Sequence, residues 1–241
     1  MAEYLGVKYN PTEGYENDVR IYIKPRNLGD ISDGSYVDFL DGEFKDYWFI
    51  RRPKLKVIAA SLYSYEHMKK RLPNEIYLIP SHHLNTDRIT RDRKEIKVCG
   101  YIGTPSPTAF KKFGELKERL KEIGMDFVIE YYFKTKQDAI NLYKQIDIFV
   151  CADWDGYDHP YKIPTKIINA ASFGIPCVAY PMMANKELEG FYLQAKNMSE
   201  TIVQVENLKN PDFYEEWSAK IAPMAENYHI SKIAELYQKL S

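Results

Sequence analysis

One stretch of this chain joins a strand end, a polar loop and a helix start that carries lysines. It reads Cys-Ala-Asp-Trp-Asp-Gly-Tyr-Asp-His-Pro-Tyr-Lys-Ile-Pro-Thr-Lys over residues 151–166. A phosphate at the helix start would meet backbone N–H groups, the Thr165 hydroxyl and the ammonium groups of Lys162 and Lys166. Asn169, three residues further on nearly the same helix face, is placed to bond a ribose or sugar hydroxyl. The stretch favours a phosphate-binding turn; a solvated loop before a capped helix is the alternative.

A second strand end is followed by small and hydroxyl-bearing residues. Gly103, Thr104 and Ser106 lie between an apolar run and an amphipathic stretch. A flexible glycine, two hydroxyls and a helix N-terminus make a modest anion site. A plain strand-to-helix turn with a serine N-cap explains the same residues. We expect Gly103 and Thr104 to contact the same ligand as Lys166.

Asp153 and Asp155 form an Asp-x-Asp pair in the first of these loops. Hard carboxylate oxygens at this spacing can hold a divalent cation against a diphosphate, and His159 lies close by in the sequence. Short acidic pairs are also common in loops. We therefore prefer a site without metal, and we expect no cofactor to be required.

The elements that must position these residues follow an alternating pattern from residue 96 onward. Short apolar runs rich in branched residues alternate with amphipathic stretches, which predicts βαβ units and a parallel sheet. Ligands bind outside the carboxyl ends of the strands in such sheets, where both polar loops lie. Strands are expected at 96–102, 127–131, 146–151 and 176–180, and helices at 110–123, 137–144 and 164–173. After residue 180 the sheet is expected to be complete, with helices near Ala184, around 213–221, and after caps at Ser199 and Ser231.

The first part of the chain predicts a smaller α/β layer. Strands are expected at 19–24, 57–61 and 76–79, with a helix at 65–72. The segment 85–95 is charged and almost devoid of apolar residues, so it is the expected linker. This divides the chain into domains at 1–94 and 95–241.

Composition narrows the function classes. The chain has 241 residues, and 33 basic and 34 acidic side chains give a net charge of -1, so no charge footprint indicates nucleic acid. Three cysteines lie in apolar runs without metal-type spacing and are expected to be buried thiols. Residues 1–17 lack the apolar core of a signal peptide or membrane anchor, so a cytoplasmic location is expected. A solvated helix face is preferred over peripheral membrane contact for Lys69, Lys70, Arg71 and Leu72.

Two runs of sequence resemble a known family. Asp147-Ile-Phe-Val-Cys-Ala and, further on, Lys166-Ile-Ile-Asn-Ala-Ala-Ser-Phe-Gly-Ile-Pro-Cys-Val-Ala-Tyr look like the donor-binding half of GT-B fold glycosyltransferases. There a strand, a loop and a helix ending in a Gly-x-Pro turn enclose a nucleotide sugar. The resemblance covers roughly residues 96–191. It implies an α/β fold of two Rossmann-like domains, the N-terminal one shortened, and sugar transfer from a nucleotide-diphosphate donor to a glycan, lipid or other biopolymer.

The resemblance also implies positions for further contacts. Retaining members of the group carry two glutamates eight residues apart, the second of which grips the ribose. Counting back from Gly174, this chain has Tyr161 and Asn169 at those places. The double-glutamate signature is thus absent, and Tyr161 joins the expected donor-site residues.

An inverting enzyme of this fold needs a base for the acceptor hydroxyl. Asp33 and His82 are the candidates in the shortened half, because each follows an expected strand. A turn residue beside Gly34 and a hydrogen-bonded domain junction at His82 and His83 are the alternatives. Two other functions stay open: a sugar-nucleotide epimerase or hydrolase on the same fold, and a non-catalytic nucleotide-sugar-binding module.

Overall fold

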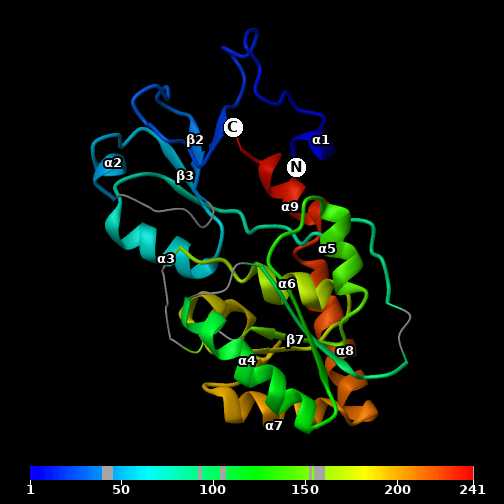
Figure 1. Cartoon of the computed structure of the whole chain (residues 1–241). Coiled ribbons are helices and arrows are strands. Elements are labelled where there is room, and N and C mark those ends of the chain that lie inside the picture. Colours follow the sequence, from blue (N-terminus) through cyan, green and yellow to red (C-terminus); the bar gives the residue numbers. More distant parts are fainter. Residues whose placement is uncertain (40–45, 92–93, 104–106, 152–153, 155–160, 241) are drawn as a thin grey trace. The chain divides into compact units, whose positions relative to one another are not determined.

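The computed structural model describes residues 1–39, 46–91, 94–103, 107–151, 154 and 161–240 (Figure 1). The chain forms two compact units. Unit 1 comprises Met1–His82, Asp158–Ile163 and Ile230–Ser241, and unit 2 comprises His83–Tyr157 and Pro164–His229.

Unit 1 contains a parallel sheet, sheet A, with strand order β1-β2-β3-β4. Its strands are β1 (Ile21–Ile23), β2 (Tyr36–Asp38), β3 (Lys56–Ala59) and β4 (Ile76–Leu78). Alternate strand residues face opposite sides. Val37 and Val57 pack in a cluster with α2 (Asp46–Ile50) and α3 (Leu62–Arg71), whereas Tyr36 and Ile58 pack in another with α9 (Ile230–Tyr237). The short α1 (Ala2–Leu5) lies near α9.

Two helix starts in unit 1 differ from the sequence prediction. The α3 helix begins at Leu62 rather than at residue 65, because Ser61 and Ser64 form a reciprocal capping box at its start. The α9 helix begins at Ile230, before the predicted cap Ser231. Ile233 and Leu240 of this C-terminal segment are buried in unit 1. The last helix therefore packs on the sheet formed by the beginning of the chain.

Unit 2 contains the second parallel sheet, sheet B, with strand order β6-β5-β7-β8-β9. Its strands are β5 (Val98–Ile102), β6 (Asp126–Glu130), β7 (Ile148–Cys151), β8 (Cys177–Ala179) and β9 (Leu193–Gln194). The four predicted strands are confirmed. The prediction that the sheet ends near residue 180 is wrong, because β9 pairs with β8. A two-residue strand is too short to show the alternation on which the prediction relied.

Helices cover both faces of sheet B. They are α4 (Pro107–Glu122), α5 (Lys136–Tyr143), α6 (Thr165–Ser172), α7 (Met198–Leu208) and α8 (Pro211–Glu226), with a 3-10 helix η1 at Met183–Leu188. The helices α4 and α7 share one core, and α5, α6 and α8 share the other (Figure 1). The α7 helix begins at Met198 because the Asn197 side chain accepts the Glu200 N–H at 2.9 Å, so the predicted cap at Ser199 is wrong.

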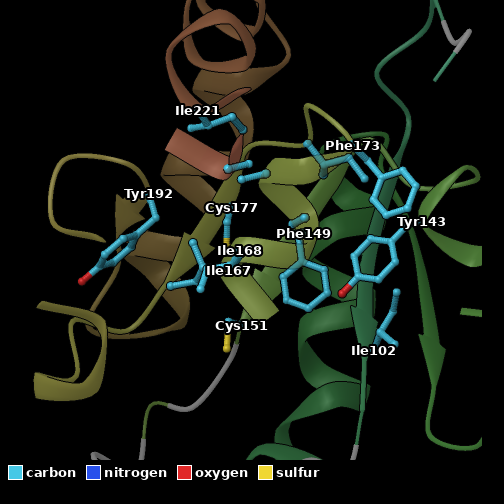
Figure 2. Packing of buried hydrophobic residues seen from close by; sticks show 14 of the residues in the cluster. Ile102, Tyr143, Phe149, Cys151, Ile167, Ile168, Phe173, Cys177, Tyr192 and Ile221 are labelled. Atoms are coloured by element: carbon cyan, nitrogen blue, oxygen red, sulfur yellow. The ribbon is translucent and has the colours of Figure 1, made fainter. Parts of the chain in front are cut away.

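The core around α6 is aromatic and sulfur-rich (Figure 2). The Tyr143 ring stacks on Phe173, with centroids 5.1 Å apart and planes 6° apart. Cys151 and Cys177 belong to the same cluster, and Cys99 is buried on the other face. All three cysteines are free and buried, as predicted. Burial raises the pKa of the Cys99 and Cys177 thiols, which disfavours reactive thiolates.

The segment expected to be a linker is instead anchored in unit 2 by a buried ion pair. Arg91 and Asp147 meet at 3.1 Å with side chains 8% and 0% exposed. The other Asp147 oxygen accepts the N–H groups of Lys97 and Val98 at 2.9 and 2.8 Å. Arg91 also donates to the Tyr214 hydroxyl at 2.7 Å. Charged residues here are part of the packed structure, which their composition alone did not indicate.

We expect Asp147→Asn to destabilise the protein by ~3–5 kcal/mol, because it leaves Arg91 buried without its counter-charge. The measurement is the free energy of unfolding from urea titration followed by circular dichroism. Glu95→Gln is the control, since the Glu95–Lys97 pair is exposed and should contribute little. Equal unfolding midpoints for the two variants would contradict the assignment.

Candidate functional site

The strand order of sheet B creates a point where ligands bind in α/β proteins. Strand β5 lies between β6 and β7, although β6 follows β5 directly along the chain. The chain therefore leaves β5 toward one side and returns to form β7 on the other. Ligands bind outside the carboxyl ends of strands at such a reversal. In sheet A the order of the described strands follows the chain, so the reversal belongs to unit 2.

Gly103 and Lys166 meet at this reversal. Gly103 follows β5 with φ +113°, a conformation that favours glycine, and an added Cβ would lie 3.6 Å from Cε of Lys166. The Lys166 ammonium donates to the Tyr101 hydroxyl at 2.5 Å and lies 4.5 Å from that ring's centroid. Tyr101 is a β5 residue that the sequence reasoning missed, since a tyrosine inside an apolar run looks like any core residue. The result is an ammonium group held beside the Gly103 turn.

Thr165 is the first residue of α6 and adds a second polar group. The N-cap residue, Pro164, provides no side-chain hydrogen bond to the helix start. The Thr165 hydroxyl oxygen is buried and has no hydrogen-bond partner in the described part of the chain. A helix start carries partial positive charge from its N–H groups. Lys166, the next residue, adds a full charge, so this end of α6 suits an anion.

Asn169, also on α6, has hydrogen-bond partners elsewhere in unit 2. Its Oδ1 accepts the Leu84 N–H at 2.9 Å. The Asn169 side chain also hydrogen-bonds the Tyr143 hydroxyl. Burial raises the pKa of Tyr143, and this hydrogen bond lowers it in part. Asn169 therefore fixes the start of the 84–91 segment against α6, a structural contact that the sequence did not indicate.

Tyr161 and Lys162 lie in unit 1, apart from the unit that holds Lys166. The Tyr161 ring is buried in the α2 and α3 core, and its hydroxyl donates to Asp46 at 3.2 Å. Burial raises the pKa of Tyr161, and the Asp46 carboxylate adds to the effect. The Lys162 carbonyl accepts from the Ser61 hydroxyl at 3.3 Å. The structure thus shows local anchors within unit 1 for both residues.

The two predicted bases lie at different ends of sheet A. Asp33 precedes β2 and pairs with Arg52 at 3.2 Å and Lys54 at 3.5 Å, at the amino ends of the strands. His82 follows β4, on the carboxyl side, and is half-buried. Only His82 is therefore on the side of its sheet where α/β proteins bind ligands.

His83 forms part of a hydrogen-bonded junction, the alternative weighed for the histidine pair. Its N–H donates to the Tyr228 carbonyl at 3.0 Å, and its ring lies 5.4 Å from that of His229. The Arg88 guanidinium lies 3.1 Å from Nδ1 of His229 and forms an ion pair with Glu226 at 3.0 Å. The hydrogen bond from Arg88 lowers the pKa of Glu226. The cluster ties together the two segments that begin and end unit 2.

A buried carboxylate at the carboxyl end of β2 was missed. Asp38 is 1% exposed, and the Tyr237 hydroxyl of α9 donates to it at 3.2 Å. This proximity and burial raise the pKa of Tyr237. The signal in the sequence was a charged residue inside an apolar run, between Val37 and Phe39.

No protein-family model matches the chain. A Haemophilus influenzae protein described as an uncharacterized glycosyltransferase is 28% identical over 132 residues, which are 51% of this chain and 36% of that protein. The chain therefore spans well under half of this curated relative.

Solved structures of glycosyltransferases have a similar fold. One from Rickettsia africae ESF-5 has a TM-score of 0.58 and 13% identity, covering 86% of this chain and 70% of its own. Anabaena HepE, solved in complex with UDP and glucose, has a TM-score of 0.58 and 14% identity, covering 85% and 70%. This chain resembles glycosyltransferases in sequence and fold. The predicted fold class, α/β with two Rossmann-like halves of GT-B type, is confirmed.

A third structure of similar fold is not named as an enzyme. The Glycosylation Associate Protein (Gap123) complex from Streptococcus agalactiae has a TM-score of 0.57 and 10% identity, covering 93% of this chain and 55% of that one. At these identities the three structures establish a shared fold.

Four predicted residues lie outside the described part of the chain: Thr104, Ser106, Asp153 and Asp155. Among the residues that are described, no group of three or more His, Cys, Asp or Glu side chains is arranged to hold a metal ion. The Asp-x-Asp pair therefore stays a prediction.

Aromatic side chains gather beside the Gly103 turn. The Gly103 N–H donates to the Glu130 carbonyl at 2.9 Å, which ties this turn to the end of β6. Tyr131 follows, and its ring centroid lies 5.7 Å from that of Phe110. The next residue, Tyr132, is 87% exposed. Exposed rings next to this turn offer flat apolar surface that could contact the uncharged part of a ligand.

No helix in the described ranges is both long and apolar enough to cross a membrane. Of the residues weighed for peripheral contact, Leu72 is buried in the unit 1 core and Arg71 pairs with Asp46. The apolar member of that set therefore does not face outward.

We expect Asn169→Ala to destabilise the protein by ~1–3 kcal/mol, because the Leu84 N–H loses its acceptor. Thermal unfolding at neutral pH measures this destabilisation. Asn141→Ala is the control, because Asn141 is an exposed helix residue that accepts a hydrogen bond from exposed Gln137. If both variants melt at the parent temperature, Asn169 has no structural role.

Proposed function

We propose that this chain is a glycosyltransferase that takes a sugar from a nucleotide-diphosphate donor bound at the reversal point of sheet B. One observation carries the proposal. The start of α6, the Lys166 ammonium and the Gly103 turn converge where β5 and β7 end. The likeness in fold to glycosyltransferases, one of them solved with UDP and glucose, supports the same conclusion.

The proposed site suits the chemistry of the leaving group. Glycosyl transfer releases a nucleoside diphosphate, so negative charge grows on its terminal phosphate as the sugar leaves. Fixed donors aimed at developing charge stabilise a transition state without reorganising. Lys166, the Thr165 hydroxyl and the amides of the first turn of α6 are such donors. Thr104 and Ser106 are predicted to add hydroxyls on the β5 side.

The relative sizes of these contacts identify the residue to test. Two unit charges 4 Å apart interact by about 4 kcal/mol at an effective dielectric constant of ~20. A neutral hydrogen bond contributes a net ~0.5–1.5 kcal/mol. Lys166 should therefore contribute more to diphosphate affinity than Thr165 does.

For the acceptor side, His82 is the better supported of the two predicted bases. It follows β4 on the carboxyl side of sheet A, whereas Asp33 is paired with two cations at the opposite edge. An imidazole is suited to accept a hydroxyl proton near neutral pH. The acceptor is proposed to be a glycan, lipid or other biopolymer carrying that hydroxyl.

A non-catalytic nucleotide-sugar-binding module is the second candidate. The residues at the two glutamate positions of retaining enzymes, Tyr161 and Asn169, both bond within their own units. Product analysis with a radiolabelled UDP-sugar separates the functions. Transfer to an acceptor supports a transferase, labelled free sugar or a changed sugar supports a hydrolase or epimerase, and binding without turnover supports the module.

We expect Lys166→Ala to weaken UDP binding at least tenfold, which corresponds to ~1.4 kcal/mol. Isothermal titration calorimetry with UDP and with inorganic pyrophosphate measures this loss. Pyrophosphate has no nucleobase, so its binding reports on the diphosphate contacts alone. Lys117→Ala is the control for the loss of one positive charge, because Lys117 lies on the exposed face of α4. If Lys166→Ala binds both probes as tightly as the parent, the diphosphate does not lie at this site.

A further inference from the structure

The residue that contacts Lys166 is itself immobile. Tyr101 is 0% exposed, and its ring centroid lies 5.0 Å from that of Phe113 and 6.2 Å from that of Phe149. These neighbours come from α4 and β7, so the ring is held between a helix and the adjacent strand. Its hydroxyl therefore has a fixed position under the Gly103 turn.

The ammonium contacts this residue in two ways. Nζ of Lys166 lies 2.5 Å from the hydroxyl oxygen and 4.5 Å from the ring centroid. The first distance is a charge-assisted hydrogen bond, and the second is within the range of a cation–π contact. A lysine side chain ordered from solution loses ~1.5–2 kcal/mol of rotamer entropy. Here the contacts with Tyr101 order it before any ligand arrives.

The turn beside this lysine favours glycine because of its backbone angle. A side chain at position 103 would start 3.6 Å from the lysine stem and would require a backbone angle that such residues rarely adopt. Burial raises the pKa of the nearby Cys177 thiol, and the positive charge of Lys166 lowers it in part. The charge is thus held close to the ends of the central strands.

We propose that Tyr101 is a positioning residue, whose hydroxyl holds the Lys166 ammonium in the place where it binds the diphosphate of the donor. The inference rests on the proposed function. It assigns part of the diphosphate affinity to a buried hydroxyl that is not expected to touch the ligand. A hydroxyl that only satisfies a buried polar group would affect stability and leave diphosphate recognition unchanged.

Tyr101→Phe removes the hydroxyl and keeps the ring, its packing and the cation–π contact. We expect about tenfold weaker binding of UDP and pyrophosphate, equivalent to ~1.4 kcal/mol, with unchanged weak binding of uridine. In a Lys166→Ala background the same substitution should cause no further loss, because the two residues act through one contact. Calorimetry on the four proteins of this cycle gives both results.

Tyr214→Phe is the matched control. Tyr214 is also a buried tyrosine of unit 2, and its hydroxyl donates to the Asp147 carbonyl at 2.8 Å, in the ion-pair network. This variant should lower the melting temperature while leaving the UDP dissociation constant unchanged. The comparison separates loss of a buried hydroxyl in general from loss of the one that holds Lys166.

A measurement on the parent protein avoids dependence on how the variants fold. In protein labelled with 15N-lysine, the Lys166 ammonium signal, identified by its absence in Lys166→Ala, should show slowed hydrogen exchange before ligand is added. Pyrophosphate should then shift the same signal. A fast-exchanging ammonium that resembles surface lysines would overturn the positioning role.

The outcomes distinguish the two proposals. If Lys166→Ala leaves UDP and pyrophosphate binding intact, or if the parent binds neither, the proposed donor site is wrong. If Lys166→Ala weakens binding and Tyr101→Phe does not, the donor site stands and the role of Tyr101 falls. Equal losses for UDP and uridine, or additive losses in the double variant, would also reduce Tyr101 to a structural residue.

Discussion

The Asp147 carboxylate holds the amino ends of β5 and β7 together, and the candidate site at their other ends depends on it. One oxygen pairs with Arg91, and the other accepts the N–H groups of Lys97 and Val98. These bonds sit beside the pairing of Cys99 with Ile148, which sets the register between the two strands. A buried carboxylate with this many partners resists a shift of β5 along β7, because a shift would leave a buried charge without its partners. The register in turn decides which residues meet where the strands end.

At those ends the chain uses a lysine fixed by a tyrosine. Lys166 is ordered by the ring and hydroxyl of Tyr101, and its stem lies beside Gly103. The resemblance to retaining glycosyltransferases implied two acidic side chains in this region. Their positions hold Tyr161 and Asn169, which bond to Asp46 and the Leu84 N–H within their own units. Both positions therefore lack the acidic side chain of the family pattern.

The shortened half owes its core to distant parts of the chain. Sheet A has short strands; Tyr161 completes one of its two hydrophobic clusters, and Ile233 and Leu240 complete the other. A small sheet buries too little apolar surface to be stable by itself, so added layers from elsewhere in the chain are needed. Tyr161 packs on one face and Ile233 on the other. A division of the chain into two consecutive pieces would separate these residues from the sheet that they cover.

The sequence alone determined the α/β class, strands β5 to β8 of sheet B and the burial of the cysteines. Each rests on local periodicity or on the rule that parallel strands end at one edge. The tertiary structure decided the partners of Asn169, Tyr161 and Asp147, the role of Tyr101 and the place of α9. Those outcomes depend on hydrogen bonds and packing between residues far apart in the chain, and the residue types are equally compatible with several partners. Periodicity shows which face of an element is buried, and only the folded chain shows what lies against it.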